Sequence, residues 1–210
     1  MIVAPVFRGN WVTEGIASAD AQPLLNHGAF IEAAKRLFDA EIVQPHNVYA
    51  NLTWQLPFPQ GIGHTDVPAF RGVDRTRYPI TFLTIMGLSG LFEDVRVQIA
   101  TAVAWFYVGK DGGFEYWPEG PDRPPVVHEG AINNTAIVGD NDFMWHRVRP
   151  TGRVEDGMVQ LSLNSELVQR NGQWAIVDDG RTLATFAREQ MRVSVSWKAN
   201  VFESDADRRR

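Results

Sequence analysis

Residues 135–148 read TAIVGDNDFMWHRV, and this segment is the most informative one about the fold. It reads as two short strands, 135–138 and 143–148, joined by a Gly/Asn/Asp turn. Similar short segments, rich in β-branched and aromatic residues and separated by Pro, Gly, Asn and Asp, recur from residue 46 to residue 202. This pattern predicts a mainly β protein with flanking helices, built as a jelly-roll barrel (the double-stranded β-helix).

Further strands are predicted at 48–55, 63–67, 81–86, 98–108, 114–117, 167–170, 173–177 and 191–202. Asn171-Gly172 indicates a hairpin, because both residues tolerate positive φ. An apolar stripe predicts a helix over 28–40. Asp179 is a candidate cap for a short helix near 181–189.

We interpret residues 1–210 as a single domain, since this length suffices for one hydrophobic core. Its expected parts are a helical flank (1–45), a jelly-roll core (46–202) with a hairpin and helix inserted at about 160–190, and a solvated tail (203–210).

The composition restricts the possible partners. The net charge of −5 disfavours nucleic acid and anionic membranes, and without cysteine any metal must bind to His and carboxylate groups. No run of 18 apolar residues occurs, and the N-terminus lacks the basic region of a secretory leader. We therefore expect a cytoplasmic protein with a small-molecule substrate; the sequence does not indicate its oligomeric state.

A candidate metal site consists of His64 and Asp66, in His64-Thr65-Asp66, together with His146. Two imidazoles and one carboxylate can occupy one face of an Fe(II) ion and leave coordination positions open. Residues i and i+2 of a strand point to the same side, so His64 and Asp66 can reach one ion. An isolated His-x-Asp is common by chance, and the alternative is a surface histidine beside a turn aspartate.

These motifs resemble the Fe(II)- and 2-oxoglutarate-dependent dioxygenase superfamily over roughly residues 45–202. The segments that match are residues 63–66, 110–118 and 135–148. Of these, residues 110–118 are similar to the family's Gly-Gly loop. The resemblance implies Fe(II), 2-oxoglutarate and O2, and an enzyme that hydroxylates or desaturates its substrate while forming succinate and CO2. It implies His64, Asp66 and His146 as the metal ligands; halogenases of the superfamily lack the carboxylate.

The resemblance also implies a cation for the distal carboxylate of 2-oxoglutarate. Arg192 and Ser194 form an Arg-x-Ser on the last predicted strand, and the strand period puts both on one face. Arg192 follows His146 at a greater distance than is usual in the family, which requires an insertion between the last two core strands. Arg153, in a turn-like context, is the rival; we favour Arg192 because a strand positions a side chain better than a loop does.

Candidate substrate contacts are Arg71 and Trp117. Arg71, Arg75 and Arg77 are either solvated loop charges or contacts to an anionic substrate, and Trp117 is either core or pocket wall. His128 is the substitute ligand if His146 is not one. Two other functions stay open: a cupin-like metalloenzyme without 2-oxoglutarate, and a non-catalytic jelly-roll binding protein.

Overall fold

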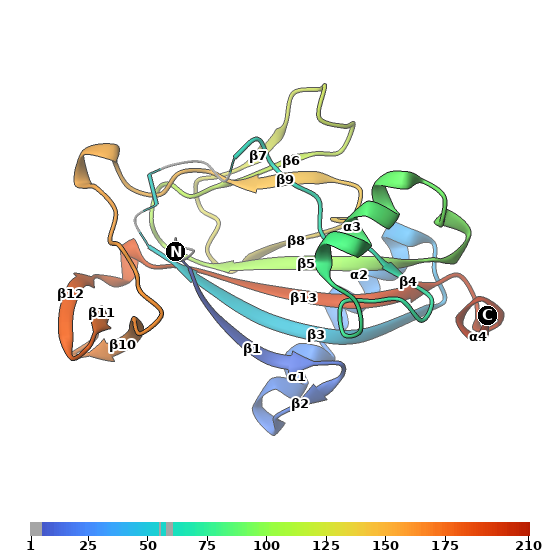
Figure 1. Ribbon diagram of the computed structural model, residues 1–210, viewed down its shortest axis with the longest axis horizontal. Coiled ribbons are helices and arrows are strands. Elements are labelled where there is room, and N and C mark those ends of the chain that lie inside the picture. Colours follow the sequence, from blue (N-terminus) through green and yellow to red (C-terminus); the bar gives the residue numbers. More distant parts are fainter. Residues whose placement is uncertain (1–5, 55, 58–60) are drawn as a thin grey trace.

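The computed structural model describes residues 6–54, 56–57 and 61–210, and within them a seven-stranded antiparallel sheet forms the centre of the molecule (Figure 1). Its order is β2 (Ile16–Ala17), β1 (Phe7–Thr13), β3 (Ile42–Thr53), β13 (Arg192–Phe202), β5 (Arg96–Phe106) and β4 (Ala69–Phe70), and β8 (Thr135–Gly139) also pairs with β5. The last strand, β13, therefore lies between two much earlier ones.

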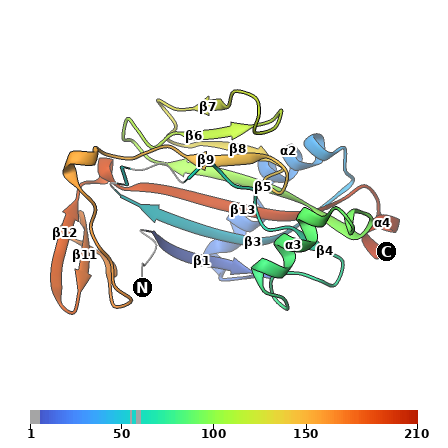
Figure 2. The ribbon, with the colours of Figure 1, turned by 45° about the horizontal axis from the view of Figure 1, so that its top comes forward.

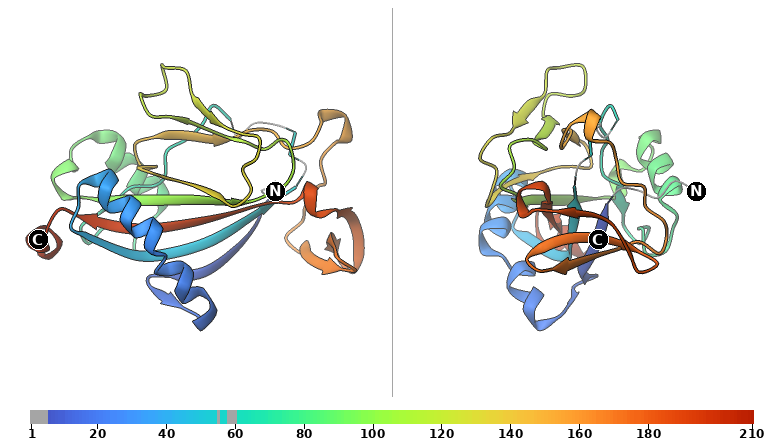
Figure 3. Two further views of the ribbon diagram at one scale, coloured as in Figure 1. Left: turned by 180° about the vertical axis from the view of Figure 1, so that it is seen from behind. Right: turned by 90° about the vertical axis from the view of Figure 1, so that its left-hand side faces the viewer.

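The two faces of this main sheet differ in chemistry because side chains alternate along each strand. On β13, Val195, Trp197 and Ala199 belong to an apolar core. This core packs against α1 (Gln22–Leu25) and α2 (Gly28–Phe38), which lie across the sheet (Figure 3), and Trp197 Nε1 donates to the Leu25 carbonyl at 2.7 Å. The helix predicted over 28–40 is thus confirmed, and the polar residues of β13 are left for the opposite face.

A smaller sheet lies over that polar face (Figure 1). Its strands are β7 (Val126–His128), β6 (Phe114–Trp117) and β9 (Trp145–Val148). His64 joins β9 through one isolated bridge to His146, with N···O distances of 3.0 and 2.9 Å. The strand predicted at 63–67 is wrong beyond this bridge, because the Asp66 amide turns to donate to the Asn141 carbonyl at 2.7 Å.

An insertion separates β9 from β13 and forms its own sheet at one end of the molecule (Figure 2). It contains β10 (Glu166–Arg170), β11 (Gln173–Asp178) and β12 (Arg181–Phe186). The Asn171-Gly172 hairpin is confirmed. The helix predicted near 181–189 is wrong: Asp179 and Gly180 have φ of 45° and 78° and make a second hairpin, and only a 3-10 turn follows at Arg188–Gln190.

The strand predicted at 81–86 is also wrong, because this segment is α3 (Ile80–Ser89). A continuous apolar run has no periodicity that separates a buried strand from a helix. The helix ends at Gly90, whose φ of 65° is the left-handed cap that glycine favours. Leu83 and Met86 pack on Phe70, which ties α3 to β4.

The other predicted strands are confirmed in place, with shifted ends, as β3, β5, β6, β8, β9 and β13. The flank predicted as helical also contains β1 and β2, and the predicted tail forms α4 (Asp205–Arg209). Gln55, at the end of one predicted strand, and residues 1–5, which bear on the expected absence of a leader, lie outside the described residues. Among the described residues, no helix is long and apolar enough to cross a membrane.

Candidate metal centre

The fold brings His64, Asp66 and His146 together, and one ligand atom from each lies within 4.8 Å of the others. The backbone explains this proximity. His64 is bridged directly to His146, and the bond from the Asp66 amide to Asn141 holds the same segment against the turn before β9. Within the described residues, this is the one group of three or more potential metal-binding side chains that meets this distance.

The ring of His146 is oriented for coordination through Nε2. Its Nδ1 lies 2.9 Å from the Met144 carbonyl, which can only accept, so Nδ1 carries the proton and donates. The lone pair is then on Nε2, which lies 3.9 Å from Asp66 Oδ1. Proteins usually fix a metal-binding imidazole in this way, with a hydrogen bond from the ring nitrogen that does not bind the metal.

The charge states of His64 and Asp66 also suit a metal. Burial, followed by the neighbouring His146, lowers the pKa of His64, which favours the neutral ring. Burial alone would raise the pKa of Asp66, but the charge and hydrogen bond of Lys198 outweigh it and the net pKa is lowered. The centre therefore offers two imidazoles and one carboxylate, a donor set that suits Fe(II) with open positions.

Lys198, on β13, is a partner of this centre that was not predicted from the sequence. Its Nζ donates to Asp66 Oδ2 at 2.7 Å and to Thr101 Oγ1 at 3.1 Å. One oxygen of Asp66 is thereby held by the ammonium group, while Oδ1 faces His146. The period of two along β13 could have placed Lys198 on the same face as Arg192, but not beside Asp66.

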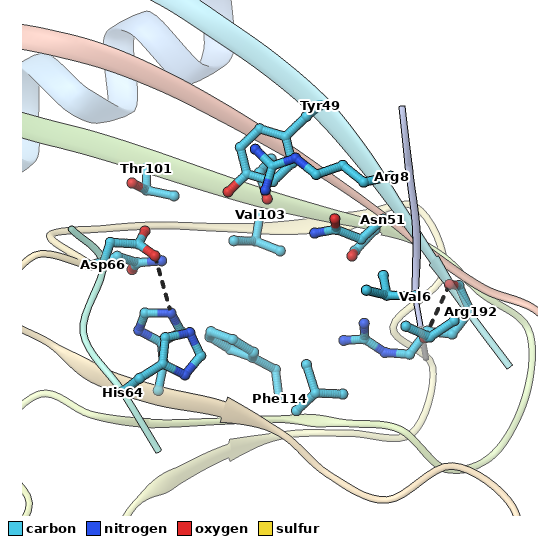
Figure 4. Close-up of a pocket in the computed structure, with 16 residues that line it drawn as sticks. Val6, Arg8, Tyr49, Asn51, His64, Asp66, Thr101, Val103, Phe114 and Arg192 are labelled. Carbon is cyan, nitrogen blue, oxygen red and sulfur yellow. Dashed lines mark hydrogen bonds and ion pairs between the residues drawn. The ribbon is translucent and has the colours of Figure 1, made fainter. Parts of the chain in front are cut away.

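A cavity of about 280 Å³ extends from the metal centre along the polar face of the main sheet. His64 and Asp66 lie at one end and Arg192 at the other (Figure 4). The walls between them include Tyr49, Asn51, Val103, Phe114, Ser194 and Ser196. The cavity thus connects a candidate metal site to a cation.

Arg192 is only 2% exposed, and its Nε donates to the Gly112 carbonyl at 2.7 Å. Its Nη2 is buried and has no hydrogen-bond partner among the residues that the structure describes. Burial lowers the pKa of Arg192 to about 10, so the group is still a cation at neutral pH. A buried cation with an unused donor fits an anionic ligand in this cavity.

Gly112 is needed for this arrangement. Its φ is 66°, and a Cβ there would lie 2.8 Å from Thr151 Oγ1 and 3.0 Å from Arg192 Cδ. The Gly-Gly segment noted in the sequence therefore lies against the arginine. Arg153, the rival, has a side chain that is 70% exposed and paired with Glu155 and Asp156, and it does not line the cavity.

The two candidate substrate residues lie elsewhere. Arg71 lines a second cavity and pairs with Asp207 at 2.6 Å. Trp117 is buried in β6, with the guanidinium of Arg147 5.4 Å from its ring centre. His128 Nε2 lies 2.9 Å from Thr135 Oγ1, and His128 is not one of the three candidate metal ligands. The structure therefore does not bring Arg71 or Trp117 to the first cavity.

No protein-family model and no curated protein matches this chain. The fold is similar to a solved structure, the crystal structure of an oxidoreductase of the 2OG-Fe(II) oxygenase family from Burkholderia pseudomallei, with a TM-score of 0.50. The two chains are 13% identical, and the similarity covers 94% of this chain and 68% of that chain. At this identity the likeness concerns the fold, and the roles of individual residues depend on the geometry described above.

Replacing Lys198 with methionine is expected to weaken Fe(II) binding by about 10- to 100-fold, the usual effect of losing a partner that orients a metal ligand. The substitution frees Asp66 Oδ2, so the carboxylate is no longer held with Oδ1 toward His146. Anaerobic Fe(II) titration measures the change. Thr101→Val is the matched control, because it removes the other partner of Lys198 and leaves the ion pair intact. Equal Fe(II) affinity in Lys198→Met and the wild type would contradict the positioning role.

His46, on β3, is expected to make the metal-free protein sensitive to acid. Burial, assisted by the charges of Lys198 and Arg75, lowers its pKa from 6.5 to about 4, and its Nε2 has no described hydrogen-bond partner. The unfolded chain therefore binds a proton first as the pH falls. The stability contributed by neutral His46 is complete above pH 6.5 and is lost toward pH 4, by up to about 3 kcal/mol.

Urea unfolding at pH 7.5, 6.0 and 5.0 tests this linkage in the wild type and in His46→Gln. The free energy of unfolding should fall less steeply with acidification in the variant, because the remaining acid-sensitive groups are common to both proteins. Parallel pH profiles would show that His46 does not contribute.

Proposed function

We propose that this protein is an Fe(II)- and 2-oxoglutarate-dependent oxygenase that hydroxylates or desaturates a small molecule and forms succinate and CO2. One observation carries the proposal: a single cavity has two histidines and an aspartate at one end and a buried arginine with an unused donor at the other. 2-Oxoglutarate has a keto acid at one end and a carboxylate at the other, so its two ends match the two ends of the cavity.

A double-stranded β-helix core is part of this proposal. The path of the chain supports it, because successive segments alternate between the two sheets: β3, β5, β8 and β13 belong to the main sheet, and the segments between them supply the His64 bridge, β6 with β7, and β9 to the smaller one. The similarity of the fold to a solved structure of the 2OG-Fe(II) oxygenase family also supports this part of the proposal. The insertion before β13 accounts for the long interval between His146 and Arg192.

In this proposal His64, Asp66 and His146 hold Fe(II). When bound, the iron and 2-oxoglutarate supply the reaction with O2 that oxidises a C–H bond of the substrate. Arg192 binds the distal carboxylate, and Ser194, two residues along the same face of β13, assists it. The burial of Arg192 keeps water from competing for the guanidinium.

The net charge of −5 supports a small-molecule substrate rather than a nucleic acid. A cytoplasmic location stays an expectation from the sequence.

Anaerobic titration with Fe(II) and 2-oxoglutarate, followed by visible absorbance, tests the proposal. A weak charge-transfer band between iron and the keto acid is expected, and glutarate, which lacks the keto group, is the matched control that gives none. Succinate formation on admission of O2 then measures turnover. Iron binding without the band would favour the cupin-like metalloenzyme, and absence of iron binding would favour a non-catalytic binding protein.

A further inference from the structure

A second cavity, of about 680 Å³, lies beside the first on the same face of the main sheet. Rows of side chains on single strands pass from one cavity into the other. On β13, residues 192, 194 and 196 line the first cavity, and residues 198 and 200 line the second. On the antiparallel strand β5, residues 101 and 103 line the first cavity, and residues 97 and 99 line the second. Arg8 lines both cavities. Because alternate residues of a strand share a face, the two cavities are consecutive stretches of one trough.

This second cavity is positively charged, although the whole chain is acidic. Five cations line it (Arg8, Arg71, Arg75, Arg77 and Lys198), against two acids (Glu14 and Asp74). A cavity whose lining carries an excess of one sign of charge attracts ligands of the opposite sign. The excess of cations therefore favours an anion.

Some of these charges already have partners. Arg71 pairs with Asp207 and Lys198 with Asp66. Arg75 and Arg77 are exposed, and neither forms an ion pair with a residue that the structure describes, although the charge of Arg77 helps to lower the pKa of Asp74. Asp74, the acid nearest to them in sequence, accepts hydrogen bonds from Thr76, at 2.6 Å from its hydroxyl and 2.8 Å from its amide. Neither arginine is thus held in an ion pair, and both line the cavity where an anionic ligand could meet them.

Another part of the same cavity is apolar. Val67, Pro68, Phe70, Val97 and Ile99 line it. Val67 directly follows Asp66, and Lys198, whose Nζ is 2.7 Å from Asp66, lines this cavity as well. A ligand with an apolar body and an anionic head in this cavity would therefore be separated from Asp66 of the candidate metal centre by the Lys198 side chain.

We infer that the second cavity binds an organic acid, a carboxylate or a phosphate monoester with an apolar body, and that this acid is the substrate. Arg75 and Arg77 bind the anionic group, assisted by Arg8, and the apolar wall beside Asp66 holds the body. Calling this acid the substrate depends on the proposed oxygenase function, whereas its binding in the cavity does not.

Calorimetric titration of the 210-residue chain without added metal tests the inference with three probes: phenylacetate, phenyl phosphate and the neutral phenylacetamide. At least one acid is expected to bind about tenfold or more tightly than the amide, and the two acids distinguish a carboxylate site from a phosphate site. The double variant R75Q/R77Q should lose this preference. Arg153→Gln is the matched control, because it removes an exposed arginine that does not line the cavity.

Three results would overturn the inference: equal binding of acids and amide, unchanged acid binding in R75Q/R77Q, or loss of acid binding in Arg192→Gln, which would place the acid in the first cavity. If the double variant does not fold, added NaCl replaces it; the affinity for the acid should fall with salt while that for the amide does not. The charge-transfer band of iron with 2-oxoglutarate is measured in a separate titration. Acid binding without the band contradicts only the oxygenase, and the band without acid binding contradicts only the acid site.

Discussion

Replacing His146 with alanine is expected to reduce Fe(II) affinity by more than about 100-fold, beyond the loss of about 10- to 100-fold that follows when only an outer partner of a ligand is removed. His146 supplies one of two imidazoles, and its Nε2 is directed to the site by the hydrogen bond of Nδ1 to Met144. Without it, only His64 and Asp66 remain in the group. Anaerobic Fe(II) titration measures the loss.

His128→Ala is the matched control for this variant. His128 lies on β7 of the same small sheet and near Thr135, but outside the metal group, so its loss should leave Fe(II) affinity unchanged. Because His146 is buried, urea unfolding of both variants is needed to show that they fold. Iron binding that survives in His146→Ala and disappears in His128→Ala would contradict the proposed ligand set.

Replacing Arg192 with methionine is expected to weaken the binding of 2-oxoglutarate by about 30- to 150-fold, which corresponds to about 2–3 kcal/mol for hydrogen bonds to a charged group. Methionine retains an unbranched apolar stem but removes the guanidinium, including the unpartnered Nη2 in the cavity. Fe(II) affinity should change little, since Arg192 lies at the far end of the cavity from the metal ligands (Figure 4). Titration of the iron-loaded protein with 2-oxoglutarate, followed by the charge-transfer band, measures this.

Arg153→Met tests the rival arginine in the same assay. Its side chain is 70% exposed and paired with two acids on the surface, so 2-oxoglutarate should bind this variant as it binds the wild type. A loss confined to Arg153→Met would show that the distal carboxylate binds elsewhere.

Short-range signals predicted much of the fold. Alternation along 191–202, the Asn171-Gly172 turn and the apolar stripe of α2 are each contained in a few adjacent residues, and the structure confirms all three. Asp179-Gly180 is the same kind of hairpin signal, and the helix predicted after it was wrong because both residues adopt positive φ and form a turn, so Asp179 caps no helix. For α3, no local pattern separated a buried strand from a helix, and packing of Leu83 and Met86 on Phe70 accompanies the helical form.

The sequence by itself determined which residues could form the metal group and that Arg192 and Ser194 share a face, because strand periodicity is a property of neighbouring residues. Only the tertiary structure decided that Arg192 is buried in the cavity while Arg153 is exposed, that Lys198 pairs with Asp66, and that Arg75 lines a second cavity. Lys198 and Asp66 are 132 residues apart, and they meet through the order of strands in the main sheet and the bridge of His64 to β9. Burial and charge pairing depend on which distant segments pack together, and the local pattern of the chain does not contain that information.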